Sequence, residues 1–214
     1  MERCVIFCAG AIEPEDLALA GVTSGDYVIG ADAGYLAAYR LGVECDLIVG
    51  DFDSSAPPAD ARAPLDLYPS RKDDTDCLIA VRKGLAHGCR DFVILGGLGG
   101  RLDHTMANFQ TICFLAEQGC GAVLYGCKTT AMALHSGAVT LPSREGYLSI
   151  FAMGSACRGV TEEGLSYSLD KAVVTNTFPI GVSNRFTGAP AVITVEEGTL
   201  LIIMTDDQPP PTAI

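Results

Sequence analysis

In the first 126 residues of the chain, short apolar runs alternate with segments in which apolar side chains recur at helical spacing. Most of the runs are rich in Val, Ile and Leu, which is typical of strands buried on both faces of a sheet. They span residues 4–8, 26–30, 46–50, 92–96 and 122–125. The helical segments span about 14–20, 34–41, 75–87 and 104–118. Strands that alternate with helices predict a mostly parallel, Rossmann-like α/β sheet with helices on both faces.

The pattern changes after residue 126, where no segment with convincing helical spacing follows. Short candidate strands take over, separated by Gly, Ser, Pro and Asn. They span residues 130–134, 138–141, 147–152, 172–175, 191–195 and 199–204. Turn signals at this spacing predict an all-β unit of the sandwich type. We therefore expect an α/β domain over residues 1–126 and a β-sandwich domain over residues 127–214.

The chain is acidic, since 14 Lys and Arg against 26 Asp and Glu give a formal net charge of −12. Without a basic cluster, this charge argues against nucleic acid or an anionic membrane as a partner. No apolar run approaches the roughly 20 residues that span a bilayer, and the first residues hold no signal-peptide core. The nine cysteines form no C-x-x-C pair, which favours reduced thiols. We expect a cytoplasmic protein.

Aspartates recur where predicted strands end. Asp51 and Asp53 follow the strand at 46–49, and Asp32 follows the strand at 26–29. Ligands of an open α/β sheet bind beyond the carboxyl ends of its strands. We therefore expect these carboxylates to share one metal- or ligand-binding edge of the sheet.

Asp51 and Asp53 are two residues apart, a spacing that turns both carboxylates the same way on an extended segment if Phe52 points into the core. Two converging carboxylates repel each other unless a cation lies between them. Mg²⁺ takes one or two carboxylates and completes its shell with water and phosphate oxygens. The alternative is that Asp51 caps a turn and Asp53 is solvated, but several acid-bearing loops at one edge favour the metal.

The loop before the third helical segment carries Asp73, Asp74 and Asp76. One of them is expected to cap the helix that begins near residue 75, and Asp74 is the preferred choice. Asp76, beside Thr75, is predicted to point toward the sheet edge as a second ligand group. Asp73 stays open between a ligand and an exposed side chain.

A glycine-rich stretch, Gly97–Gly100, follows the strand at 92–96. Glycines let backbone N–H groups approach a phosphate, and a helix that starts near residue 104 directs its positive end to the same place. Arg101 can then neutralise a phosphate through two hydrogen bonds, and Asp103 can hold a metal or an attacking hydroxyl. The stretch matches neither a P-loop nor a dinucleotide-binding fingerprint.

The sequence offers no arrangement of Ser, His and Asp, or of Cys and His, that would predict a nucleophilic side chain. Direct transfer between two bound substrates fits better. His104, next to the glycine-rich stretch, either contacts a phosphate or packs at the start of its helix.

Three motifs in combination, GDFDS at 50–54, DDTD at 73–76 and GGLGGRLDH at 96–104, resemble the thiamine pyrophosphokinase family. The resemblance covers about residues 4–205 and includes ADAG at 31–34, EGLSYSL at 163–169 and SNRF at 183–186. It implies a transferase that moves a pyrophosphoryl group from ATP to the hydroxyl of thiamine, giving thiamine diphosphate and AMP. It also implies an α/β domain for ATP and Mg²⁺, a β-sandwich domain for thiamine, and a homodimer with active sites between subunits.

The resemblance further implies roles for single residues. Asp51, Asp53 and Asp76 would bind Mg²⁺ and, with Arg101 and Asp103, form the catalytic group. The residues implied to bind ATP or its phosphates are Asp32, Gly34, Asp73, Thr75, Gly99, Gly100, Arg101 and His104. The residues implied to bind thiamine are Tyr167, Ser183 and Asn184. Tyr167 stands where some relatives have Trp, and this chain has no Trp.

Other functions stay open from the residues alone. One is a pyrophosphokinase or nucleotidyltransferase that acts on another small alcohol. Another is a non-catalytic, metal-dependent nucleotide-binding regulator, and a third is an α/β scaffold whose carboxylates are only solvated. Formation of AMP with thiamine, compared with pterin alcohols, would separate them.

Overall fold

The computed structural model describes residues 3–51, 61–69 and 73–206. The chain divides into two compact units, residues 1–127 and residues 128–214. We call them the α/β unit and the β unit and describe each by itself. Among the described residues, no helix is long and apolar enough to cross a membrane.

The α/β unit contains a six-stranded sheet in the order β4-β3-β2-β1-β5-β6. All of its strand pairs are parallel. Its strands are β1 (Arg3–Phe7), β2 (Tyr27–Ala31), β3 (Leu47–Gly50), β4 (Leu65–Leu67), β5 (Asp91–Leu95) and β6 (Gly121–Gly126). Its helices are α1 (Pro14–Ala20), α2 (Gly34–Arg40), α3 (Asp76–His87) and α4 (Leu102–Glu117). The expected mixed α/β class is therefore confirmed.

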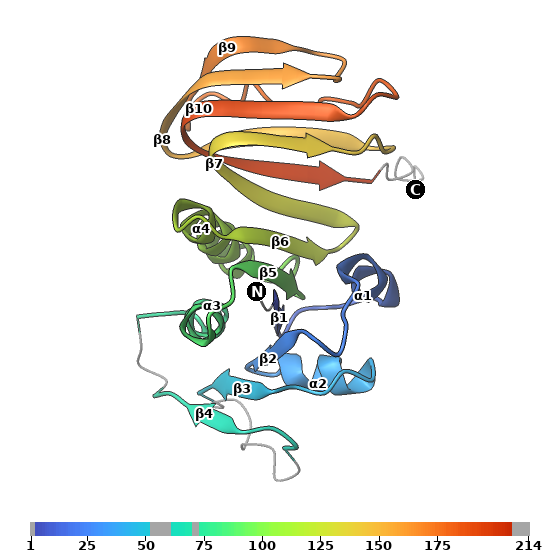
Figure 1. The fold of residues 1–214 in the computed structure, drawn as a ribbon, viewed down its shortest axis with the longest axis vertical. Coiled ribbons are helices and arrows are strands. Elements are labelled where there is room, and N and C mark those ends of the chain that lie inside the picture. Colours follow the sequence, from blue (N-terminus) through green and yellow to red (C-terminus); the bar gives the residue numbers. More distant parts are fainter. Residues whose placement is uncertain (1–2, 52–60, 70–72, 207–214) are drawn as a thin grey trace, which may run out of the picture. The chain divides into compact units, whose positions relative to one another are not determined.

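Figure 1 shows α1 and α2 beside one face of this sheet and α3 and α4 beside the other. The alternation of side chains along β1 explains this arrangement. Val5 and Phe7 belong to a core cluster that includes Tyr35 and Ala38 of α2. Cys4 points the other way, toward α3, where a Cβ added to Gly84 would lie only 2.8 Å from the Cys4 sulfur. The sheet is thus buried on both faces.

One helix start was predicted two residues late. The fourth helical segment was expected from residue 104, but α4 begins at Leu102. Leu102 is 82% exposed, so it does not belong to the apolar face whose spacing carried the prediction.

The β unit contains a four-stranded antiparallel sheet in the order β7-β10-β8-β9. The strands are β7 (Thr129–Leu141), β8 (Tyr147–Glu163), β9 (Leu169–Val174) and β10 (Ala191–Thr205). The prediction of six short strands was wrong. The candidates at 191–195 and 199–204 are one strand, β10, whose register shifts between Val195 and Thr199. The Gly198 that suggested a turn lies at this bulge, where an extra residue bends a strand without ending it.

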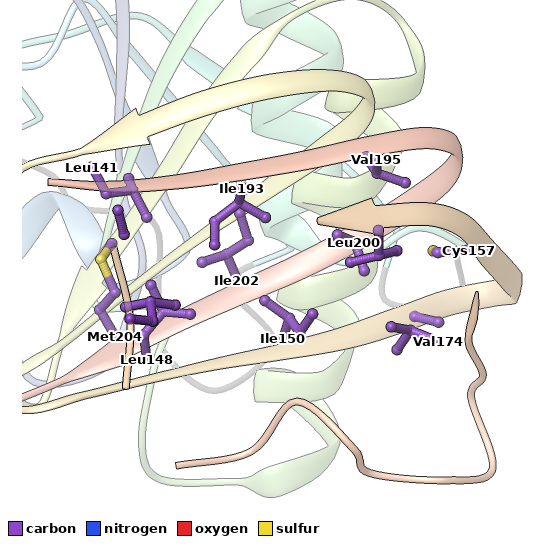
Figure 2. Packing of buried hydrophobic residues seen from close by; sticks show 14 residues of the cluster. Leu141, Leu148, Ile150, Cys157, Val174, Ile193, Val195, Leu200, Ile202 and Met204 are labelled. Carbon is purple, nitrogen blue, oxygen red and sulfur yellow. The ribbon is translucent and has the colours of Figure 1, made fainter. Parts of the chain in front are cut away.

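The core of the β unit lies on one face of these strands (Figure 2). Leu148 and Ile150 of β8 and Ile202 of β10 are at most 1% exposed. Their spacing of two residues in β8 follows the alternation of a strand with one buried face.

Candidate active site

A hollow of about 340 Å³ opens in the α/β unit beyond the carboxyl ends of β1 and β5. From β1 the chain builds the sheet outward through β2, β3 and β4, and then returns to place β5 on the other side of β1. This reversal is the topological switch point at which open α/β sheets bind ligands. The residues that line the hollow include Cys8 and Gly10 after β1 and Gly96 and Gly97 after β5.

The loop after β5, which we call the glycine loop (Gly96–Gly100), forms one side of the hollow. The Gly10 N–H donates to the Gly96 carbonyl oxygen at 3.1 Å, which ties the loops after β1 and β5 together. Gly99 and Gly100 have φ values of 78° and 67°, in the left-handed region that glycine adopts without strain. Both line the hollow and are exposed. Helix α4 follows at once, so its N-terminal amides favour an anion at this place.

Arg101 and Asp103 lie at the start of α4. Arg101 donates two hydrogen bonds to the Asp103 carboxylate, Nη2 to Oδ2 at 2.6 Å and Nε to Oδ1 at 3.1 Å. This fork lowers the pKa of Asp103 to about 2 and raises the pKa of Arg101. Arg101 lines the hollow beside the exposed His104. Asp103 is therefore a permanent carboxylate at neutral pH, held beside a permanent guanidinium.

The start of α3 forms another side of the hollow. Thr75 is the residue that caps α3, and its Oγ1 accepts from the Leu78 N–H at 3.2 Å. The expectation that Asp74 is the cap was wrong, because Asp74 instead pairs with Arg82 at 3.1 Å. Asp76 is the first residue of the helix, is half-buried and lines the hollow together with Thr75. Asp73 is exposed and lies outside the lining.

Two further aspartates end neighbouring strands. Asp32 follows β2, lines the hollow and has a left-handed φ of 50°, and its N–H donates to the Val49 carbonyl oxygen at 2.7 Å. Asp51 directly follows β3 at the same end of the sheet but is not part of the lining. Asp53 lies outside the described residues. The same end of the sheet thus presents carboxylates from Asp32, Asp51 and Asp76.

Gly34, predicted to bind ATP, has a packing role in the structure. It is the first residue of α2, is buried, and lies outside the lining. A Cβ at this position would lie 1.9 Å from the carbonyl oxygen of Phe7. Only glycine therefore lets α2 approach β1 this closely.

Asn108 and two cysteines belong to the hollow but were not predicted. Asn108 is 6% exposed, and its Nδ2 donates to the Gly97 carbonyl oxygen at 2.8 Å, which fixes the glycine loop. It lies four residues after His104, one helical turn, so the spacing could have identified it. Cys8 and Cys77 also line the hollow and are free thiols, whereas the sequence pattern predicted reduced cysteines without placing any of them at a site.

Carboxylate oxygens are the donors that Mg²⁺ prefers, and one or two of them are enough when phosphate and water complete the shell. The hollow itself is lined by two carboxylates, Asp32 and Asp76. Within the described part of the chain, no group of three or more His, Cys, Asp or Glu that could hold a metal is found.

The residues predicted to bind thiamine lie together in the β unit. Asn184 is 3% exposed, whereas Tyr167 is 75% exposed. The Asn184 Oδ1 accepts from the N–H groups of Tyr167 and Arg185, each at 3.0 Å, and its Nδ2 donates to the Tyr167 carbonyl oxygen at 2.6 Å. Ser183 is exposed, has a left-handed φ of 62°, and donates its N–H to Ser149 Oγ at 3.0 Å. A non-glycine residue in this conformation is often part of a functional turn.

The β unit also contains a buried carboxyl group. Glu162 is 1% exposed. Its Oε1 has no hydrogen-bond partner among the described residues. Burial raises the pKa of Glu162 to about 7. No sequence pattern points to this residue, because it stands in an ordinary alternating strand beside a second glutamate, Glu163.

Sequence comparisons give one family for both units. Its profile described as "Thiamin pyrophosphokinase, catalytic domain" matches residues 21–124, and its profile described as "Thiamin pyrophosphokinase, vitamin B1 binding domain" matches residues 138–200. The thiamine pyrophosphokinase of Bacillus subtilis (strain 168) is 25% identical over 186 residues, which cover 84% of this chain and 87% of that protein.

Solved structures share the fold. The crystal structure of thiamine pyrophosphokinase from Bacillus subtilis superimposes with a TM-score of 0.85 at 21% identity, over 97% of this chain and 100% of that one. The crystal structure of yeast thiamin pyrophosphokinase gives a TM-score of 0.75 at 15% identity, over 95% and 86% of the two chains.

Proposed function

This chain belongs to the thiamin pyrophosphokinase family, whose members transfer a pyrophosphoryl group from ATP to thiamine, and we propose that the hollow in its α/β unit is the ATP site. The chain is accordingly a kinase that converts thiamine and ATP to thiamine diphosphate and AMP. One observation supports this location: the glycine loop, the start of α4 and Arg101 lie together at the switch point of the sheet.

The hollow would hold the ATP phosphates through its backbone and its cation. Gly100 is exposed, and no atom lies within 4 Å of the place that a Cβ would take, so phosphates would have room to approach the N–H groups of the loop here. Arg101, with Thr75 and His104 close by in the lining, would contact the phosphate oxygens. Because Asp103 holds the guanidinium in a fork, Arg101 meets the phosphates already oriented, and this reduces the entropy lost on binding.

The carboxylates at this end of the sheet would hold Mg²⁺. We assign Asp51, Asp53 and Asp76 to it, with Asp32 and Asp73 available to the bound nucleotide. The support is the donor chemistry, since Asp51 ends β3 and Asp76 begins α3 at the same end of the sheet. When bound, Mg²⁺ supplies positive charge that offsets the negative charge of the phosphates and of the protein.

The transfer itself would depend on orientation and charge. The thiamine hydroxyl attacks the β-phosphorus of ATP in line with the departing AMP. Asp103, a weak base with a pKa of about 2, would accept a hydrogen bond from this hydroxyl and orient it, and the proton released as the new O–P bond forms would pass to water. Arg101 would stabilise the charge that develops on the transferred group.

The β unit would bind thiamine through Tyr167, Ser183 and Asn184. The exposed ring of Tyr167 can stack on a heterocycle, and Ser183 can donate to it. We further propose that the long bent strands of this unit close into a sandwich, that two chains form a homodimer with active sites at the subunit interface, and that the enzyme works in the cytoplasm.

One reaction tests the proposal. Purified protein, Mg²⁺, ATP and thiamine should give thiamine diphosphate and AMP in equal amounts, and chromatography measures both. AMP that forms with a pterin alcohol but not with thiamine would favour another pyrophosphokinase. Tight ATP binding with no AMP from either alcohol would favour a regulator.

A further inference from the structure

One buried amide side chain lies against the glycine loop. Asn108 of α4 is 6% exposed and lines the hollow together with Gly97. Its Nδ2 donates to the Gly97 carbonyl oxygen at 2.8 Å, and this hydrogen bond is buried. A Cβ added to Gly97 would lie 3.1 Å from Nδ2 and 2.6 Å from the Leu124 side chain. A side chain at this position would therefore push the loop away from the amide.

The carbonyl groups of residues 96–99 all face donors of the protein. In chain order, the donors are the Gly10 N–H at 3.1 Å, Asn108 Nδ2 at 2.8 Å, Cys127 Sγ at 3.7 Å and the Thr105 hydroxyl at 3.5 Å. Carbonyl oxygens repel a phosphate, whereas the N–H groups of a turn attract it. The loop thus directs its repelling groups away from a bound anion.

The direction of each carbonyl group also determines where the next N–H group points. In a trans peptide, the C=O and the N–H of the following residue point in opposite directions. The Gly99 N–H therefore points away from Cys127, and the Gly100 N–H points away from Thr105. Both glycines line the hollow. The contacts behind the loop thus determine how its N–H groups are presented.

Asn108 is the strongest of the side-chain donors in this set. A thiol is a weak donor, and the single O–H of Thr105 is shared between the carbonyl oxygens of Gly99 and Arg101. Without Asn108, the Gly97 carbonyl group would lack a donor in its buried position, and turning toward the hollow would let water reach it. Its oxygen would then lie where phosphates are expected to bind and would repel them.

We propose that Asn108 is a positioning residue for the ATP phosphates: it holds the Gly97 carbonyl group toward α4 and so keeps the glycine loop in its phosphate-binding conformation. This inference rests on the proposed ATP site in the hollow. Asn108 acts through the loop rather than on the reacting atoms.

The first test is Asn108→Leu, which removes the donor and keeps a side chain of similar size. Its Kd for ATP in the presence of Mg²⁺, measured by isothermal titration calorimetry, should rise about tenfold, because the loop loses the hydrogen bond that orients it. Its KM for thiamine should stay within about twofold of the wild type, since that substrate is assigned to the β unit. Asn108→Gln keeps the amide donor and should recover most of the affinity for ATP.

Thr111→Val provides the matched control. Thr111 is also buried in α4, but its hydroxyl donates to the Ala107 carbonyl oxygen within the same helix, at 2.9 Å. This variant should bind ATP like the wild type. All three variants should unfold cooperatively on heating, and their near-UV circular dichroism should match that of the wild type.

Four results would overturn the inference. Asn108→Leu would bind ATP within about twofold of the wild type, or its KM for thiamine would rise in the same proportion as its Kd for ATP. Asn108→Gln would bind ATP as weakly as Asn108→Leu, so the donor would not be what matters. An Asn108→Leu variant that does not fold would assign Asn108 to the core instead of to the loop.

The proposed function can fail separately from this inference. Wild-type protein that binds ATP but forms no thiamine diphosphate would contradict the function and leave the positioning role standing. A further measurement needs neither substrate: the NMR resonance of the Leu98 N–H, which belongs to the same peptide unit as the Gly97 carbonyl, should shift in Asn108→Leu and stay in place in Thr111→Val. An unshifted resonance in Asn108→Leu would show that Asn108 does not hold this peptide.

Discussion

The two proposed substrate regions use their polar groups in different ways. In the α/β unit, the side chain of Arg101 lines the hollow and is 72% exposed, and its partner Asp103, which lies outside the lining, is 63% exposed. In the β unit, Asn184 is 3% exposed, and its side-chain amide hydrogen-bonds to the backbone of Tyr167 and Arg185. The first region presents exposed charged groups to a ligand, whereas in the second the buried Asn184 also holds a turn. Substitutions in the first should therefore affect chemistry, and substitutions in the second should affect stability first.

The largest effect is expected at Arg101. Arg101→Ala should lower kcat by about 10³-fold, because one donor to the developing charge is lost, while thermal unfolding stays near that of the wild type. Arg62 provides a close control. It forms an ion pair with Glu44 at 2.6 Å, with exposures of 67% and 62%, much like the pair of Arg101 and Asp103 at 2.6 Å.

Arg62→Ala should therefore leave turnover unchanged. Release of AMP at a near-normal rate from Arg101→Ala would contradict the placement of the active site in the hollow. Loss of activity in both variants would show that the effect comes from surface charge rather than from position.

The second effect is expected at Asn184. Asn184→Ala removes the buried side chain that hydrogen-bonds to the backbone of Tyr167 and Arg185. Because backbone groups of the turn lose these three hydrogen bonds, the free energy of unfolding should fall by about 3 kcal/mol, measured by urea denaturation. Ser183→Ala, in the exposed neighbour, should change it by less than about 0.5 kcal/mol. Equal costs for the two would mean that the turn is not held by Asn184.

This contrast also shows how far the sequence could predict the two regions. At the hollow, the alternation of strands and helices placed Asp76 and Arg101 at the ligand end of the sheet, and the structure brings both to one cavity. In the β unit, the residues that matter are set by side-chain contacts between distant segments. Neither alternation nor turn signals report that Asn184 reaches Tyr167, 17 positions away in the chain.

The helix starts show the same limit at shorter range. The sequence predicted a cap just before α3 but chose Asp74, because several residues there can cap a helix. The choice between them depends on where the chain enters the first turn, and that direction is fixed by tertiary packing. The bulge in β10 was missed for a similar reason, since glycine marks both bulges and turns.

The third effect concerns Glu162 and pH. Burial raises its pKa from the ordinary value of 4.5 to about 7 in the folded protein. Between pH 4.5 and about 7, the folded state therefore keeps the Glu162 proton that the unfolded state has released. The stability contributed by the neutral carboxyl group is fully present below pH 4.5 and is lost as the pH rises through 7.

A pKa change of this size corresponds to roughly 3 kcal/mol between the two ends of that range. Glu162→Gln stays neutral at every pH. The difference in unfolding free energy between this variant and the wild type should therefore shift in favour of the variant as the pH rises from 4 to 8, which urea denaturation across this range can measure. A difference that does not change with pH would mean that Glu162 titrates normally and is not buried as described.

The smallest effect is expected at two adjacent residues before α3, which repeat the contrast between internal and exposed groups within one loop. Thr75 accepts a hydrogen bond from the Leu78 N–H, whereas Asp74 forms a partly exposed ion pair with Arg82. Thr75→Ala leaves an N–H of the first turn without its acceptor and should lower the free energy of unfolding by about 1 kcal/mol. Asp74→Ala should lower it by no more than about 0.5 kcal/mol, because water replaces the lost partner. If Asp74→Ala were the more costly of the two, measured by urea denaturation, Asp74 rather than Thr75 would be the cap that matters for α3.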